Sequence, residues 1–145
     1  MTLQNWANNG WLRAHKTSNQ EIKQLLEIVD RDLHDAQQRG LSADWRFGIA
    51  YNAALKLCAI LMYAEGFRPE KILAHYRILQ ALSIILGPEK EDDASYLDTC
   101  RTKRNTVEYD YVGGATNADA DELITFVKKL KNEVLDWLKQ NHPDL

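Results

Sequence analysis

The chain has 145 residues, of which 45% are hydrophobic and 27% are charged, and its formal net charge is −3. This length and composition fit one soluble globular domain. The net charge argues against nucleic-acid binding through overall positive charge, but it is compatible with a local basic patch. The N-terminus lacks the pattern of a signal peptide, and no continuous apolar run approaches the roughly 20 residues of a membrane span. We therefore expect a cytoplasmic protein that does not enter a membrane.

Cysteine and histidine patterns bear on metals and cofactors. Cys58 and Cys100 are too few for a disulfide framework, and both fall in helical patterns, as core thiols in a reducing compartment do. The chain also has four histidines: His15, His34, His75 and His142. None of them is spaced like a metal ligand pair. We expect no metal and no cofactor.

The predicted elements, taken in chain order, are all helical, and no segment is a convincing strand. The first covers about residues 3–15, although Asn8-Asn9-Gly10 interrupts it. We expect residues 1–16 to form a short flap helix that lies across the other elements.

The second predicted helix opens at Ser18, and Glu21 follows three residues later in the pattern of a capping box. Apolar side chains then repeat at helical spacing until Gly40 ends the helix. The third predicted helix opens at Ser42 and runs to Glu65. It is apolar almost all round, so we expect it to be buried on most faces.

Two polar residues, Asn52 and Lys56, interrupt the third helix at positions i and i+4. They form either a strip that faces solvent or the polar wall of a site. The fourth predicted helix starts after Arg68, with Pro69 near its first turn, and stops at Gly87.

An acidic loop, residues 89–93, precedes the fifth predicted helix, residues 94–111. The sixth covers residues 117–140, with Asn117 as its cap and acidic residues near its positive end. Short connections between the helices favour antiparallel neighbours.

These elements predict an all-α fold, an antiparallel up-and-down bundle of four or five helices. The bundle covers residues 17–141, and residues 1–145 form a single domain that includes the N-terminal flap.

The fifth predicted helix carries an unusual string, RTKRNTVEYDY, at residues 101–111. Its apolar seam runs through Leu97, Cys100 and Val107, and Arg104 occupies the seam position between the last two. A guanidinium at such a position needs a partner. Arg104 pairs either with Glu108 or an acid on a neighbouring helix, or it binds a phosphate or RNA, for which its planar fork is suited.

The same string resembles the signature of HEPN domains, which are small helical bundles in prokaryotic toxins, antiviral systems and partners of nucleotidyltransferases. That signature is Arg, often followed by Asn, then four to six residues, then His. Ribonuclease members use this Arg and His without a metal, across a dimer cleft. The upstream string AYNAALKLCAILMYAEGFRPEKILAHYRILQAL also resembles the family's buried helix, its Gly-Tyr/Phe-Arg turn and its His-Tyr pair. The resemblance covers roughly residues 20–140.

The resemblance implies roles for individual residues. Arg104 and Asn105 match the Arg-Asn pair, and Tyr109 stands where the ribonucleases have His. Arg104 and Tyr109 are therefore the candidate catalytic residues, although Tyr has a pKa near 10 and is a poor general base. Tyr111 matches the Tyr of the His-any-Tyr motif, which can receive AMP from a nucleotidyltransferase in toxin members. Tyr111 is thus either a modification site or the end of the core seam.

The resemblance further implies a set of RNA- or nucleotide-binding residues: Arg101, Arg104, Asn105, Glu108, Tyr111 and His75. For His75, the alternative is a hydrogen-bonded histidine at the edge of the core. The leading hypothesis is a toxin- or defence-type protein that binds RNA or a nucleotide and works with a nucleotidyltransferase antitoxin. We expect a homodimer with the Arg104 face near the two-fold axis.

Two other functions stay open. One is a non-catalytic module that binds a nucleotide or a protein. The other is a metal-independent endoribonuclease with Tyr109 in place of the usual His and with a histidine such as His75 recruited from elsewhere in the chain.

Overall fold

The computed structural model describes residues 1–109 and 112–145, with the side chains of residues 107–109 left out. The described residues are mostly helical, as predicted for the all-α class. In chain order the elements are α1 (Leu3–Asn8), β1 (Leu12–Ala14), α2 (Asn19–Ala36), α3 (Ala43–Ala64), β2 (Phe67–Pro69), α4 (Ala74–Leu86), a 3-10 turn (Pro88–Lys90), α5 (Glu91–Tyr109) and α6 (Asn117–Asn141).

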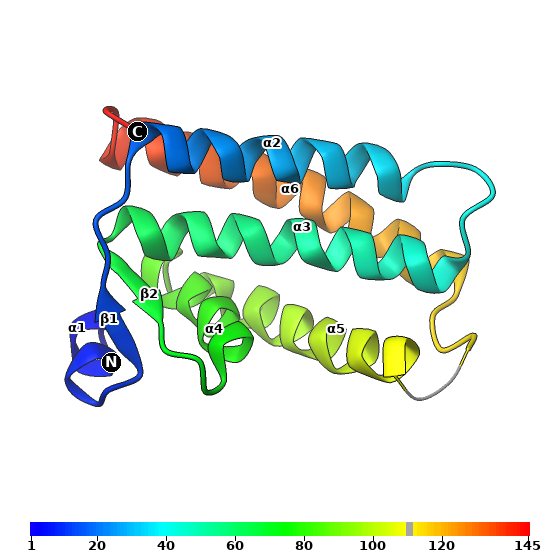
Figure 1. Cartoon of the computed structure of the whole chain (residues 1–145), viewed down its shortest axis with the longest axis horizontal. Helices are drawn as coiled ribbons and strands as arrows, with labels where there is room; N and C mark the ends of the chain where they lie inside the picture. The colour runs from blue at the N-terminus through cyan, green and yellow to red at the C-terminus, as the bar shows by residue number, and fades with distance from the viewer. Residues whose placement is uncertain (110–111) are drawn as a thin grey trace.

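Helix α3 runs through the middle of the molecule, with α2 and α6 on one side and α4 and α5 on the other (Figure 1). Because its side chains are apolar nearly all round, it can pack on every face, and Leu57, Ile60 and Leu61 have no more than 5% of their surface exposed. Helix α3 is long and apolar enough to span a membrane by length and mean hydropathy, although the polar residues Asn52 and Lys56 interrupt its apolar run. However, 67% of that stretch is buried inside the fold, as in the core helix of a soluble protein.

Helices α2 and α6 each begin with a side-chain cap. Ser18 Oγ accepts a hydrogen bond from the Glu21 backbone N–H (3.1 Å), as predicted, but the Glu21 carboxylate turns to Thr17 and His15 instead of closing the box. The cap of α6 is Thr116 and not the predicted Asn117. Thr116 Oγ1 accepts from the Asp119 backbone N–H (3.0 Å), and the Asp119 carboxylate accepts from the Thr116 N–H, which forms a capping box.

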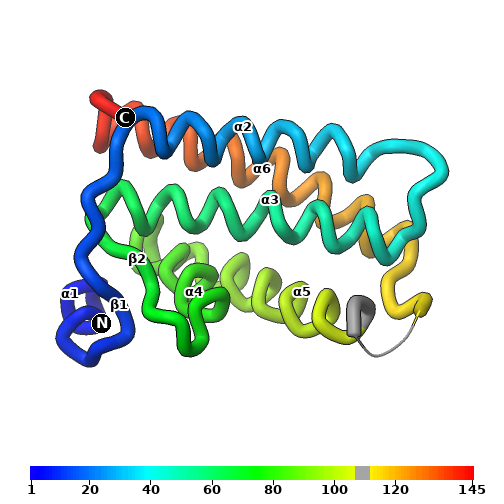
Figure 2. The backbone as a smooth tube through the Cα atoms, viewed as in Figure 1, coloured from blue at the N-terminus to red at the C-terminus, as the bar shows by residue number. Residues whose placement is uncertain are grey.

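The N-terminal segment is not the predicted flap helix. Helix α1 ends at Asn8, and residues 12–14 pair antiparallel with residues 67–69, so the prediction of no strand was wrong. Pro69 is accordingly the end of β2 and not part of the first turn of α4. This segment lies beside β2 and α4, at the end of the molecule where the C-terminus also lies (Figure 2). Tertiary contact decides the strand here, since Leu12 is buried on the core.

Two further boundaries differ from the prediction. Helix α4 begins only at Ala74, after Leu73 adopts a left-handed backbone (φ 57°), which is costly for a bulky side chain. The predicted acidic loop is instead the 3-10 turn followed by the first turn of α5. Acidic residues stabilise the positive end of a helix dipole, so the charged stretch 89–93 favours a helix start over a loop.

Candidate functional site

The three cations of the α5 motif point in different directions. The Lys103 ammonium turns to α6, where it donates to Asp119 (3.0 Å). Arg101 and Arg104 lie instead near Tyr51 of α3, and the Arg104 guanidinium carbon is 5.8 Å from the centroid of the Tyr51 ring. Only two of the three cations therefore share a surface with α3.

Tyr51 is a buried residue with a polar end. It is 2% exposed, and its hydroxyl has no hydrogen-bond partner among the described residues. Burial raises the pKa of Tyr51, although the positive charges of Arg101 and Arg104 act in the opposite direction. The hydroxyl therefore stays protonated and can donate a hydrogen bond to an acceptor that reaches it.

His75 lies in the first turn of α4 and is exposed. Its partial desolvation, together with the charges of Arg104, Lys56 and Arg101, lowers the pKa of His75. The imidazole is therefore neutral at pH 7 and can accept a proton or a hydrogen bond. The structure thus brings together His75, Arg101 and Arg104, which the sequence assigned to one site.

Aromatic rings extend this group of cations along α4. The Arg101 guanidinium carbon is 5.7 Å from the centroid of the Tyr76 ring, and Arg101 also pairs with Asp98 (2.8 Å). Arg77 is 6.0 Å from the same Tyr76 centroid and 3.8 Å from the centroid of Trp11. Two arginines therefore lie within 6.0 Å of the Tyr76 ring centroid, one from α4 and one from α5.

We call this group the arginine–aromatic cluster. Its members are Trp11, Tyr51, Lys56, His75, Tyr76, Arg77, Arg101 and Arg104.

Sequence reasoning missed several members of the cluster. Tyr76 and Arg77 directly follow His75 in the string HYR, which is a signal that could have been used. Tyr51 lies on a helix that is apolar all round, and Trp11 lies on a segment predicted to be helical. No local sequence pattern therefore indicates that either residue lies close to the arginines.

The remaining predicted site residues either lie outside the arginine–aromatic cluster or are not among the described side chains. Asn105 is exposed. The side chains of Glu108 and Tyr109, and the whole of Tyr111, lie outside the described residues, so their roles stay predictions. Asn52 is partly buried, and its amide donates to the buried carboxylate of Asp32 on α2 (2.6 Å), which gives it a structural role.

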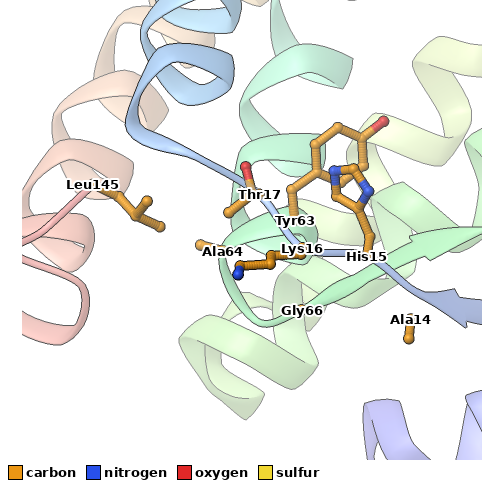
Figure 3. Close-up of a pocket in the computed structure, with 8 residues that line it drawn as sticks. All are labelled: Ala14, His15, Lys16, Thr17, Tyr63, Ala64, Gly66 and Leu145. Atoms are coloured by element: carbon orange, nitrogen blue, oxygen red, sulfur yellow. The ribbon is translucent and has the colours of Figure 1, made fainter.

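A pocket of about 510 Å³ lies at the end of α3, next to the C-terminus (Figure 3). The rings of His15 and Tyr63 lie against each other there, with centroids 4.9 Å apart. The Glu21 carboxylate lies 2.7 Å from His15 Nε2 and accepts from the Thr17 hydroxyl (2.6 Å). Desolvation opposes the ionisation of Glu21, but these hydrogen bonds and nearby positive charge outweigh it and lower the pKa. Glu21 thus holds two of the residues that line this pocket, His15 and Thr17.

Metal and thiol chemistry find little support in the described part of the chain. Within it, no group of three or more His, Cys, Asp or Glu side chains could hold a metal ion. Burial raises the pKa of Cys58 to about 12 and that of Cys100 to about 11. Both thiols therefore stay protonated at neutral pH and are poor nucleophiles.

The arginine–aromatic cluster has a defined chemical capacity. Guanidinium groups present planar donors that match phosphate oxygens, and aromatic rings can stack on bases. Because the net charge of the chain is −3, the positive charge of the cluster is a local feature. In comparisons with known proteins, no family model, no curated protein and no solved structure matches this chain.

Proposed function

We propose that this chain is a HEPN-like protein of the toxin or defence type that binds RNA or a nucleotide at the arginine–aromatic cluster. One observation carries the proposal: three different helices contribute Arg101, Arg104, His75 and the rings of Tyr51 and Tyr76 to one place. Arginine recognises phosphate through paired N–H donors, and tyrosine stacks on unpaired bases. The packing of α2, α4, α5 and α6 around α3 supports an antiparallel, up-and-down bundle of the HEPN kind.

The test is RNA binding by the purified protein, measured by fluorescence anisotropy with a labelled single strand at several salt concentrations. We expect Arg104→Gln to weaken binding about tenfold or more, because a hydrogen bond to a charged group contributes about 1.5–3 kcal/mol. Lys131→Gln is the matched control, since it removes the same charge from a lysine that pairs with Asp30 on α2. Equal affinities of the two variants, with both folded by circular dichroism, would overturn the proposal.

A second candidate function, metal-independent RNA cleavage, is favoured by the neutral His75 beside Arg104. His75 takes the proton of a ribose 2′-OH, and the 2′-oxygen attacks the adjacent phosphorus. The 5′-oxygen leaves with a proton from Tyr109, while Arg104 stabilises the charge on the phosphoryl oxygens. The products are a 2′,3′-cyclic phosphate and a 5′-hydroxyl.

Cleavage is tested with RNA and a chelator present. We expect His75→Ala and Arg104→Gln each to abolish the product. The rate of the intact protein should fall as the pH drops through the lowered pKa of His75, because the base must be neutral, and it should fall again at a pH high enough to ionise Tyr109, because the acid must be protonated. No product from the intact protein at high concentration would leave the non-catalytic binding module as the function.

The proposal includes partners that follow from the HEPN resemblance. A homodimer with the cluster near the two-fold axis should give twice the chain mass of 16.7 kDa in light scattering. A monomeric mass at micromolar concentration would exclude a cleft shared by two chains. The cluster of a single chain would then have to bind the ligand alone. A partner nucleotidyltransferase would transfer the adenylyl group of ATP to the Tyr111 hydroxyl, with pyrophosphate and the phenolic proton leaving. The chain would gain the mass of AMP less one water, and Tyr111→Phe should prevent it.

A further inference from the structure

We propose that Arg77, held against Trp11, is a second phosphate-binding subsite of the arginine–aromatic cluster. Its ligand is therefore an oligonucleotide strand with at least two phosphates, and the N-terminal segment of residues 1–16 helps to build the site. This inference rests on the proposed function of the cluster and narrows its ligand. It adds a segment that lies outside the part of the chain that resembles HEPN domains.

The first observation is the environment of the Arg77 guanidinium. Its central carbon is 3.8 Å from the centroid of the Trp11 ring, 5.9 Å from Trp6 and 6.0 Å from Tyr76. At 3.8 Å the guanidinium lies over the face of the indole. A stacked guanidinium keeps its five N–H groups in its own plane, so the stacking does not use them.

The second observation is that Arg77 has no ion pair, and its buried Nε no acceptor, among the described residues. Other arginines are different: Arg31 pairs with Asp32, and Arg46 pairs with Asp121. A buried N–H without an acceptor is costly, and stacking on Trp11 offsets part of that cost. A bound anion beside the guanidinium would lower the cost further.

The third observation is the position of Arg77 relative to the rest of the cluster. Arg77 and Arg101 both lie within 6.0 Å of the centroid of the same Tyr76 ring. Asp98 partly neutralises Arg101 (2.8 Å), so Arg77 is the cation beside this ring that has no acidic partner among the described residues. A strand with one phosphate near Arg101 and another near Arg77 provides that anion, and the Tyr76 ring near both arginines can stack on a base.

The fold holds this subsite in place before any ligand binds. The Trp11 carbonyl accepts a hydrogen bond from the Glu70 N–H (2.9 Å), directly beyond the β1–β2 pairing. Trp11 also packs edge-on against the buried Trp6. The indole is therefore fixed by backbone pairing, and the guanidinium stacked on it is preorganised for a phosphate.

The experiment compares two ligands, a labelled single-stranded RNA and AMP, on the full-length protein. We expect Arg77→Gln to bind the RNA about tenfold more weakly and to bind AMP within twofold of the intact protein. The slope of log affinity against log salt for the RNA should become shallower by about 0.7, the value for one neutralised phosphate of a single strand. Arg104→Gln should weaken the binding of both ligands.

The outcomes separate the two proposals. If Arg77→Gln binds RNA with unchanged affinity and salt slope while Arg104→Gln binds it more weakly, the subsite is refuted and the proposed function stands. If Arg104→Gln binds both ligands like the intact protein, the proposed function itself fails.

A second variant covers the case in which Arg77→Gln does not fold. Arg77→Lys keeps the charge but loses the planar fork, so we expect a smaller loss of RNA affinity and an unchanged salt slope. RNA affinity of Arg77→Lys equal to that of the intact protein would refute a specific role for the stacked guanidinium.

Discussion

Cations on two sides of the molecule are held in two different ways. On the side of α2 and α6, Lys131 pairs with Asp30, and Arg46 reaches across from α3 to Asp121. On the side of α4 and α5, Arg77 stacks on the Trp11 ring, whereas Arg101 lies against Tyr76 and also pairs with Asp98 (2.8 Å). An ion pair neutralises its cation, whereas a ring leaves both the charge and the N–H groups able to meet an anion. Among the described residues the contrast is therefore clearest for Arg77, and Arg101 is intermediate between the two kinds of cation.

The largest expected effect lies on the ion-paired side. Asp32 is 5% exposed, and its carboxylate accepts hydrogen bonds from Asn52 (2.6 Å) and Arg31 (3.0 Å). Asp32→Ala leaves the Asn52 amide without its partner, so we expect the free energy of unfolding to fall by about 1–3 kcal/mol. Urea denaturation measures this loss. The RNA affinity of Asp32→Ala should stay within twofold of that of the intact protein. A larger change would show that the ion-paired side of the molecule also contributes to RNA binding.

The complementary change lies in the cluster. Arg101→Gln removes one guanidinium from beside Tyr76, and we expect RNA affinity to fall about tenfold. The free energy of unfolding should change by less than about 1 kcal/mol, because the pair of Arg101 with Asp98 is partly exposed. Anisotropy and urea denaturation on the same preparation provide both values. A large loss of stability with unchanged affinity would assign Arg101 to structure.

A smaller effect on stability is expected for Glu21, which bonds to His15 and Thr17, two of the residues that line the pocket of Figure 3. The pKa of Glu21 is lowered below its ordinary value of 4.5, so its stabilising effect is present above that value and is lost as the pH falls through the lowered pKa. Between pH 6 and pH 3 the melting temperature of the intact protein should drop more than that of Glu21→Gln. We expect the difference in unfolding free energy to stay under about 1 kcal/mol. Parallel curves of melting temperature against pH for the two proteins would contradict a stabilising role of ionised Glu21.

The smallest effect is expected for Tyr51→Phe. The Tyr51 hydroxyl is buried and has no hydrogen-bond partner among the described residues. Its removal should therefore leave the free energy of unfolding unchanged or raise it by up to about 1 kcal/mol. A loss of more than about 1 kcal/mol would show that the hydroxyl bonds to a residue outside the described part. A few-fold loss of RNA affinity at unchanged stability would show that the hydroxyl donates to the ligand.

Local chemistry made much of the helical content predictable. Ser42 caps α3 and Gly66 follows its end, and both signals act within one turn of the helix that they bound. The β1–β2 pairing could not be predicted in this way, because each strand has only three residues and its partner is distant in sequence. Pro69 was misplaced for the same reason, since it is compatible with both a helix start and an edge strand.

The candidate site was predictable in part. Helix periodicity placed Arg104 on an otherwise apolar seam, and the resemblance placed His75 beside it. Trp11 and Arg77 were out of reach, because their contact depends on the strand pairing that local patterns did not reveal. Tyr51 was hidden because a buried tyrosine in an apolar helix is indistinguishable from ordinary core in the sequence.

The pairing of β1 with β2 also sets an order of folding. It joins residues 12–14 to residues 67–69, so the closed loop contains all of α2 and α3. Closing a long loop costs entropy before any contact compensates it, so we expect these strands to pair only after α2 and α3 have packed. A sheet this short should also be among the first parts to open in the native state.

Amide hydrogen exchange would record this hierarchy, with the amides of His15 and Glu70, which donate across the β1–β2 pairing, exchanging faster than the middle of α3. If an RNA strand holds Arg77 against Trp11, exchange at those two amides should slow when RNA is bound. The last part of the chain to fold would then be the part that senses whether the site is occupied.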